Sequence, residues 1–344
     1  MKQIAFLVII FTFVFHNCSA QITGGQGVYN FLNLPSSVKQ AAMGGDVVAL
    51  QNADLGFIIG QPSLLAAKHS HNIYLLATRH IAKSIWGGAS FAYTLPKSKV
   101  NFATGVYFLN HEKQTRTNEF GENIGNVFNT EATFYVASSY PILPRTHIGV
   151  SVQAVNSNLD NYISTGLVGN LGITYHDTTH NFMLTLLVDQ VGVMLDSYSN
   201  TKEPLDYDIK LGLSKRLQYL PLEISLTIHH LNQFDIRYND PAANVATNLF
   251  DDPNTKPKTY FVSKVLNHLS VGGDLKVNKW LQLQAGYNHL RRSELGAIYR
   301  KRLSGFTMGF AIKTKRWGIQ YAYTPYHVGA NVHSISLLTK LPHF

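Results

Sequence analysis

The chain has 344 residues, of which 45% are hydrophobic, 12% are aromatic and only 14% are charged, and its formal net charge is +9. Such an apolar and weakly charged composition excludes a disordered chain, and the modest positive charge without dense Lys/Arg clusters argues against nucleic-acid binding. No stretch beyond the first 20 residues approaches the roughly 18 consecutive apolar residues of a membrane-spanning helix, so a helical membrane protein is excluded as well. The length suits two ordinary domains or one large β architecture.

Residues 1–20 have the parts of a secretory signal peptide. Lys2 gives a basic start, residues 4–15 form an apolar core, and Cys18 and Ala20 are small residues three and one before the expected cut. Cys18 is the only cysteine. A lipid on Cys18 is the alternative, which the bulky residues before it disfavour. We predict export with cleavage after about Ala20, which leaves a chain held by its own packing or by a membrane rather than by disulfides.

Alternating apolar residues dominate the chain from about residue 71 to the end. In residues 222–228, for example, Leu and Ile alternate with Glu, Ser and Thr. A period of two indicates a β-strand with one apolar face and one polar or small face. Fourteen segments show this pattern, at about 71–78, 84–95, 99–110, 126–140, 145–156, 163–174, 179–190, 206–217, 219–230, 261–277, 279–290, 303–313, 315–324 and 331–341.

The connections between these segments alternate between short and long. Links such as 96–98 are tight, whereas 111–125, 191–205 and 231–260 are long. Short periplasmic turns, long extracellular loops and strands of about ten residues are typical of outer-membrane barrels. We therefore predict an all-β fold, an antiparallel transmembrane β-barrel of about 14 strands over residues 71–344. A soluble secreted barrel or a pair of sandwiches is the alternative.

Residues 21–70 form a different segment. The run 31–45 predicts a capped helix with Gly44 and Gly45 past its end, and a short apolar strand is expected at 57–59. We expect this segment, with Pro35 and Pro62 among its motif residues, to act as a short helical plug or hatch. It would fold inside the barrel or lie across its periplasmic mouth.

The same segment carries a resemblance to a known family. Residues 31–37 (FLNLPSS), 41–45 (AAMGG) and 62–65 (PSLL) resemble PorQ, a family of outer-membrane proteins of the type IX secretion system. The related PorV proteins share the Pro, Ala-rich and Gly-Gly pattern. Both families resemble the fatty-acid channel FadL in having a fourteen-stranded barrel with an N-terminal hatch.

The resemblance implies a non-enzymatic role in the outer membrane of a Gram-negative bacterium. PorQ-like proteins are expected to anchor a PorZ-like surface protein beside PorU and PorV, which attach secreted cargo to lipopolysaccharide. The expected surroundings are lipopolysaccharide and outer-membrane lipid, with no cofactor. The alternative function is a FadL-like channel for hydrophobic solutes, which predicts an apolar pocket in the lumen. Gly, Ser, Thr and Gln at the lumen-facing positions mildly disfavour such a pocket.

The long loops supply candidate residues for partner binding. Aromatic side chains among polar residues suit a protein interface, and arginine pairs bidentately with phosphate. The alternatives are packing of the aromatic loop into the barrel mouth and a solvated rim of basic residues. The candidates are Phe234, Tyr238 and Phe250 in the longest loop and Arg291, Arg292 and Arg300 in a basic cluster.

Neither an enzyme nor a metal site is expected. Ser36 and Lys39 match the Ser-x-x-Lys motif of penicillin-binding proteins, but a match this short occurs by chance and the Lys-Thr-Gly strand of those enzymes is missing. Zinc needs three or four converging ligands. His176 and His180 flank a predicted turn without an obvious third ligand, and the adjacent His229 and His230 are expected to point to opposite faces of a strand.

Overall fold

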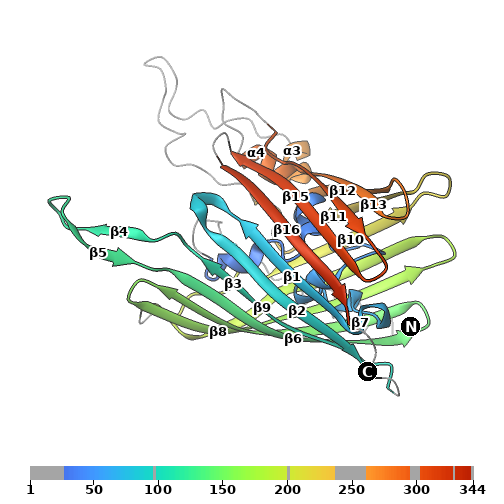
Figure 1. Ribbon diagram of the computed structural model, residues 1–344, viewed down its shortest axis with the longest axis horizontal. Coiled ribbons are helices and arrows are strands. Elements are labelled where there is room, and N and C mark those ends of the chain that lie inside the picture. Colours follow the sequence, from blue (N-terminus) through green and yellow to red (C-terminus); the bar gives the residue numbers. More distant parts are fainter. Residues whose placement is uncertain are drawn as a thin grey trace, which may run out of the picture.

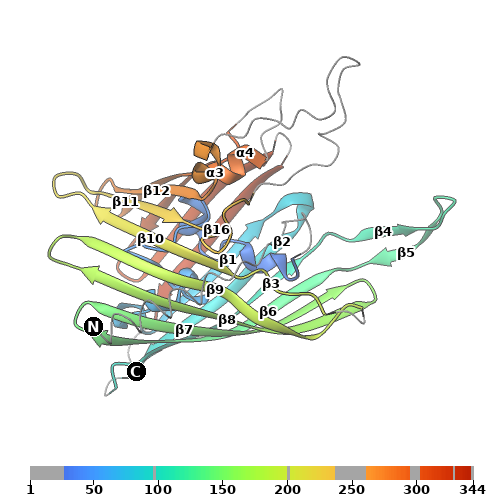
Figure 2. The same ribbon diagram turned by 180° about the vertical axis from the view of Figure 1, so that it is seen from behind.

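The computed structural model describes residues 27–95, 98–199, 202–236, 261–294, 303–327 and 330–341. Fourteen antiparallel strands form a closed barrel, in which each strand pairs with its neighbours along the chain (Figures 1 and 2). The barrel closes where β1 (Asn72–Arg79) pairs with β16 (Ala330–Lys340), from Asn72 opposite Lys340 to Arg79 opposite His333. The predicted all-β barrel of about 14 strands is confirmed.

The remaining barrel strands follow the predicted segments closely. They are β2 (Ile85–Thr94), β3 (Asn101–Asn110), β6 (Thr130–Leu143), β7 (Thr146–Leu159), β8 (Tyr162–Asp177), β9 (Phe182–Asp196), β10 (Asp208–Arg216), β11 (Leu222–Ile228), β12 (Leu269–Lys276), β13 (Leu281–Asn288), β14 (Phe306–Lys313) and β15 (Trp317–His327). Two further strands, β4 (Gln114–Thr117) and β5 (Asn123–Val127), form a separate hairpin that projects beyond the barrel (Figure 1).

Successive residues of each barrel strand point alternately to the outside of the barrel and to the lumen. In β11 the apolar Ile224 is 41% exposed on the outside, whereas Glu223 and Ser225 are buried on the inside. A lipid-facing outer surface and a polar inner surface explain why charged residues can stand in strand positions. Among the described residues, no helix is long and apolar enough to cross a membrane.

A helical segment fills part of the lumen. Its polar groups bond to lumen-facing side chains all round the wall, such as Ser151, Ser225 and Thr307. We call residues 27–71 the hatch. Its elements are η1 (Asn30–Asn33), α2 (Val38–Ala42), η2 (Leu55–Ile59), η3 (Pro62–Leu64) and η4 (Ala67–His69).

Three local expectations were wrong. Residues 57–59 belong to the 3-10 helix η2, because Asp54 caps its start by accepting from the Gly56 amide. The segment 261–277 begins with the helix α3 (Phe261–Asn267), and only its second half is a strand. The end of the segment 279–290 enters the helix α4 (His289–Glu294). A short η5 (Ile81–Lys83) joins β1 to β2.

Candidate functional site in the barrel lumen

The α2 helix of the hatch is defined at both ends by local sequence. Ser37 caps its start by accepting from the amides of Lys39 and Gln40. Gly44 and Gly45 follow its end with φ values of 103° and 92°, a conformation that glycine adopts without strain. A Cβ on Gly286 of β13 would lie 2.2 Å from the Gly44 amide nitrogen, so the hatch backbone rests directly on the wall there.

The two prolines of the predicted hatch motif also lie at contacts with the wall. The indole of Trp86 on β2 donates to the Pro35 carbonyl at 3.0 Å. Pro62 is the first residue of η3, and a Cβ on Gly149 of β7 would lie within 2.6 Å of the Pro62 backbone. Pro35, Gly44 and Pro62 therefore lie against the barrel wall, whereas Gly45 lies against Arg291 of α4.

A buried ion pair ties the hatch to β12 of the wall. The Lys39 ammonium lies 2.7 Å from a carboxylate oxygen of Asp274 on β12, and both side chains are almost completely buried. Lys39 also donates to the Asn52 carbonyl at 3.2 Å, and the Gln284 amide donates to Asp274 at 3.1 Å. Because each charge is paired and hydrogen-bonded, the burial is tolerated. Ser36 donates instead to the Gly56 carbonyl, so Ser36 and Lys39 form no nucleophile pair.

Other titratable groups of the hatch are strongly desolvated. Burial and the neighbouring Lys68 ammonium lower the pKa of His69 to about 4, so its imidazole is neutral at pH 7. Its ring nitrogens meet the Ala53 carbonyl at 3.0 Å and the Ala66 amide at 3.1 Å. Burial and the nearby Lys39 ammonium lower the pKa of Lys68 to about 8. The hatch is therefore packed as a protein interior and not as a solvated loop.

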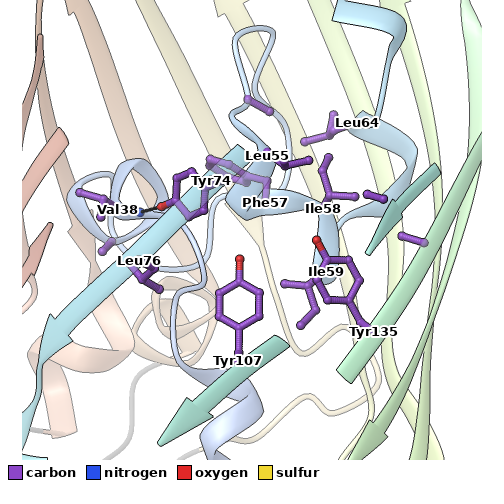
Figure 3. Packing of buried hydrophobic residues seen from close by; sticks show 14 of the residues in the cluster. Val38, Leu55, Phe57, Ile58, Ile59, Leu64, Tyr74, Leu76, Tyr107 and Tyr135 are labelled. Carbon is purple, nitrogen blue, oxygen red and sulfur yellow. Dashed lines mark hydrogen bonds between the residues drawn. The ribbon is translucent and has the colours of Figure 1, made fainter. Parts of the chain in front are cut away.

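An aromatic stripe runs along the inner wall on strands β1, β2, β3 and β6. Trp86 stacks on Tyr107 with ring centroids 5.4 Å apart, and Tyr107 lies 6.1 Å from Tyr135. Tyr74 on β1 accepts from the Val38 amide of the hatch at 3.0 Å, as Figure 3 shows. We call Tyr74, Trp86, Tyr107 and Tyr135 the aromatic stripe; each is at most 2% exposed.

Apolar residues of the hatch cover this stripe. Phe31 packs edge-on against Trp86 with ring centroids 6.1 Å apart. Leu55, Ile58 and Ile59 belong to the same buried cluster as Tyr107 and Tyr135 (Figure 3). On this side of the barrel the inner wall is aromatic, and the hatch covers it. The sequence does carry a signal for the stripe. Along their strands, the lipid-facing residues stand at every second position, and Trp86, Tyr107 and Tyr135 stand at the positions between them.

A small polar pocket lies beside the covered stripe. It has a volume of about 60 Å³, enough for a few water molecules, and Trp86 forms part of its wall. Asp46 of the hatch and Asp189 and Lys210 of the wall also line it. Lys210 lies 2.7 Å from Asp189, so these charges form a buried pair and not a free binding group. The pocket offers room for water next to an apolar surface that is occupied by the hatch.

Three of the six predicted partner-binding residues, Phe234, Arg291 and Arg292, lie among the described residues. Phe234 is 59% exposed and packs near Phe261 of α3, with ring centroids 6.0 Å apart. The Arg291 guanidinium lies 4.7 Å above the Tyr326 ring and borders Gly45 of the hatch. Arg292 donates to the Ser304 carbonyl at 3.3 Å. The remaining candidates, Tyr238, Phe250 and Arg300, lie outside the described residues.

The histidines differ from expectation in one respect. His230 has a φ of 56°, so the chain turns after β11 and the Nδ1 atoms of His229 and His230 lie 2.7 Å apart. The expectation that these rings point to opposite faces is therefore wrong. Even so, within the part of the chain that the structure describes, no group of three or more His, Cys, Asp or Glu could hold a metal ion.

Comparison of the structure with solved proteins gives the fold its class. No protein-family model matches the sequence, and none of the curated proteins matches it. The toluene transporter TodX of P. putida superposes with a TM-score of 0.52 and 14% identity, over 90% of this chain and all of that one. The chain has a FadL-like barrel fold.

The monoaromatic hydrocarbon channel CymD and a FadL homologue of Pseudomonas aeruginosa each give a TM-score of 0.50, with 12% and 10% identity. The CymD match covers 91% of this chain and 99% of that one, and the FadL homologue match covers 89% and 98%.

Proposed function

We propose that the protein is an outer-membrane channel that passes small hydrophobic solutes through the lumen. The observation that carries this proposal is the aromatic stripe, an apolar path along the inner wall of a barrel whose lumen is otherwise polar. The protein is similar in fold to proteins described as a toluene transporter and a monoaromatic hydrocarbon channel, and this similarity also supports a small hydrophobic solute.

The stripe suits a planar apolar solute because the hatch contacts that cover it can be exchanged. An edge-on aromatic pair such as Phe31 on Trp86 contributes about 0.5–1.5 kcal/mol beyond the area that it buries. A solute ring that replaces Phe31 against Trp86 restores this contact. Passage then needs a displacement of the 29–34 segment of the hatch, while the buried Lys39–Asp274 pair keeps the rest of the hatch in place.

Uptake into proteoliposomes tests the channel. With Tyr107→Ser the lumen side of β3 becomes polar, and we expect toluene uptake to fall severalfold. Phe108→Ser on the same strand is the matched control, because Phe108 is 37% exposed on the lipid-facing side and should leave uptake unchanged. Uptake by the wild-type protein that equals the leak of protein-free vesicles would overturn the proposal.

A binding measurement tests the same path without transport. The chain has three tryptophans, and Trp280→Phe with Trp317→Phe leaves Trp86 as the single reporter. We expect toluene to change the Trp86 emission in a saturable manner. With the further substitution Phe31→Ala, the rim of the stripe is uncovered and the half-saturating concentration should fall.

The second candidate function is an outer-membrane anchor, for which the β4–β5 hairpin is the specific observation. It projects beyond the barrel (Figure 2), and Phe120 and Ile124 are 87% and 56% exposed on it. Two-stranded hairpins with exposed apolar residues gain stability from a partner. On this proposal the hairpin holds a PorZ-like surface protein beside PorU-like and PorV-like components and lipopolysaccharide.

Affinity isolation from solubilised outer membranes tests the anchor. A near-stoichiometric surface protein that is lost with Phe120→Ser and Ile124→Ser would support it. Isolation of the protein alone, with a bound apolar molecule, would favour the channel.

A further inference from the structure

We infer that the apolar face of α3 and the side chains of Leu231 and Phe234, beyond the end of β11, insert into the outer leaflet of the membrane, with lipid acyl chains as their partner. In this arrangement they complete the lipid-facing belt of the barrel above its shortest strands. The inference rests on the outer-membrane placement proposed above and adds a membrane contact outside the strands.

The first observation is that the wall has two unequal sides. Strand β9 has 15 residues and β8 has 16, whereas β11 has 7 and β12, β13 and β14 have 8 each. With a rise of about 3.3 Å per residue and a tilt near 40°, β9 spans about 38 Å along the membrane normal but β12 spans only about 20 Å. The apolar belt of an outer-membrane barrel is about 25 Å tall. The short side therefore leaves several ångströms of the belt uncovered.

The second observation is an apolar face on α3. Phe261 and Val262 are 67% and 63% exposed, and Val265 and Leu266 are 39% and 37% exposed. These positions are related by i, i+4 spacing, so they form one stripe on the helix. Four neighbouring exposed apolar residues on a single face favour contact with an apolar environment.

This face continues the lipid-facing side of the barrel. α3 leads within two residues into β12, whose outward Val271 is 40% exposed. Beyond the end of β11, Leu231 and Phe234 are 49% and 59% exposed, and Phe234 lies beside Phe261. Figures 1 and 2 show α3 next to the ends of β12 and β13, on the short side of the barrel.

The charges near α3 agree with a lipid partner. Lys264 is the one charged residue of the helix, and it points away from the apolar face to pair with Asp235 at 2.7 Å. The same ammonium lies 5.9 Å from the centre of the Phe234 ring. The four residues of the α3 face carry no charge, and the Lys264–Asp235 pair beside them is neutral as a whole, as contact with acyl chains requires.

Depth-dependent quenching tests the inference in the full chain. In a Cys18→Ala background, which removes the single cysteine, Val262→Cys is labelled with an environment-sensitive fluorophore and reconstituted in bilayers containing brominated acyl chains. Val271→Cys on the lipid-facing wall is the positive control, and Phe120→Cys on the β4–β5 hairpin is the aqueous control. We expect quenching at Val262 to approach that at Val271 and to exceed that at Phe120 severalfold.

Two results would overturn the inference in different ways. Quenching at Val271 but not at Val262 would place α3 in water or against a protein, with the barrel still in the membrane. If outer-membrane proteins then shield the Val262 label from an aqueous quencher, the face binds protein. No quenching at Val271 would contradict the membrane placement itself, and with it the proposed function.

Discussion

At the scale of single residues, the lumen is organised by paired charges that join distant parts of the chain. Lys39 and Asp274 are 235 positions apart and meet in a nearly water-free site. The backbone amide of Gln51 in the hatch donates to the buried Glu223 carboxylate on β11 at 2.6 Å. Such contacts specify where the hatch lies, because Asp274 meets the Lys39 cation, and the Gln51 amide meets its acceptor, only when the hatch is seated.

We expect Lys39→Met to destabilise the seated hatch by about 3–5 kcal/mol, because it leaves the Asp274 carboxylate buried without its cation. The double variant Lys39→Met, Asp274→Leu should recover most of this loss. Hydrogen exchange of hatch amides measures both effects. Lys83→Met removes the exposed pair with Glu112 and is the matched control, expected to change little. Equal protection in Lys39→Met and wild type would contradict the role of the pair.

A second residue-scale prediction concerns pH. His69 has a pKa of about 4 in the folded protein against about 6.5 in an exposed chain, so the unfolded hatch binds the extra proton as the pH falls. The stability contributed by neutral His69 is complete above about pH 6.5 and is lost progressively toward pH 4, by about 2 kcal/mol at pH 5. Protease sensitivity of the hatch should therefore rise between pH 7 and pH 5. His69→Gln should remove most of this pH dependence. A variant with the same pH profile as the wild type would contradict the role of His69.

At the scale of elements, much of the architecture could be predicted from the sequence. Twelve of the fourteen predicted segments begin and end within four residues of their strands, because a two-sided wall imposes strict alternation. The exceptions are 261–277, whose first part is helical, and 179–190, beyond which β9 continues to Asp196. The prediction of one strand over 261–277 is wrong because the apolar residues of 261–266 are compatible with a helix as well as with a strand. The β4–β5 hairpin was missed because its residues carry no apolar alternation.

The docking of α2 could not be predicted, because it depends on which wall positions lack a side chain. Gly286 and Gly273 belong to neighbouring strands, but only Gly286 touches the hatch. We expect Gly286→Ala to displace the 43–45 backbone and raise proteolysis of the hatch. Gly273→Ala, where a Cβ meets nothing closer than 3.7 Å, should behave as wild type. Both variants can be compared by limited proteolysis of the folded barrel.

At the scale of the whole molecule, the inner wall has two kinds of surface that face the hatch. The polar lumen positions hold the hatch through hydrogen bonds, while the aromatic stripe supplies an apolar surface beneath it. The polar lumen positions could be predicted from the sequence because they are abundant. The stripe has one aromatic residue on each of four strands, so it is recognisable only when those strands are aligned.

We expect the intact protein to show almost no ion conductance in a planar bilayer, because the hatch lies in the lumen and bonds to side chains all round the wall. Deletion of residues 27–70 should give a steadily open pore. The deleted barrel must first be shown to be folded by its heat-modifiable gel mobility. A folded deletion variant that stays closed would mean that the external loops, and not the hatch, block the lumen.

The position of the hatch also constrains the order of assembly. The hatch precedes β1 in the chain, and the barrel becomes a closed ring only when β1 pairs with β16, the first and last strands. After closure, α2 and η3 would have to enter past the inward-facing side chains of the wall. Closure of β1 onto β16 with the hatch already between the strands avoids this passage.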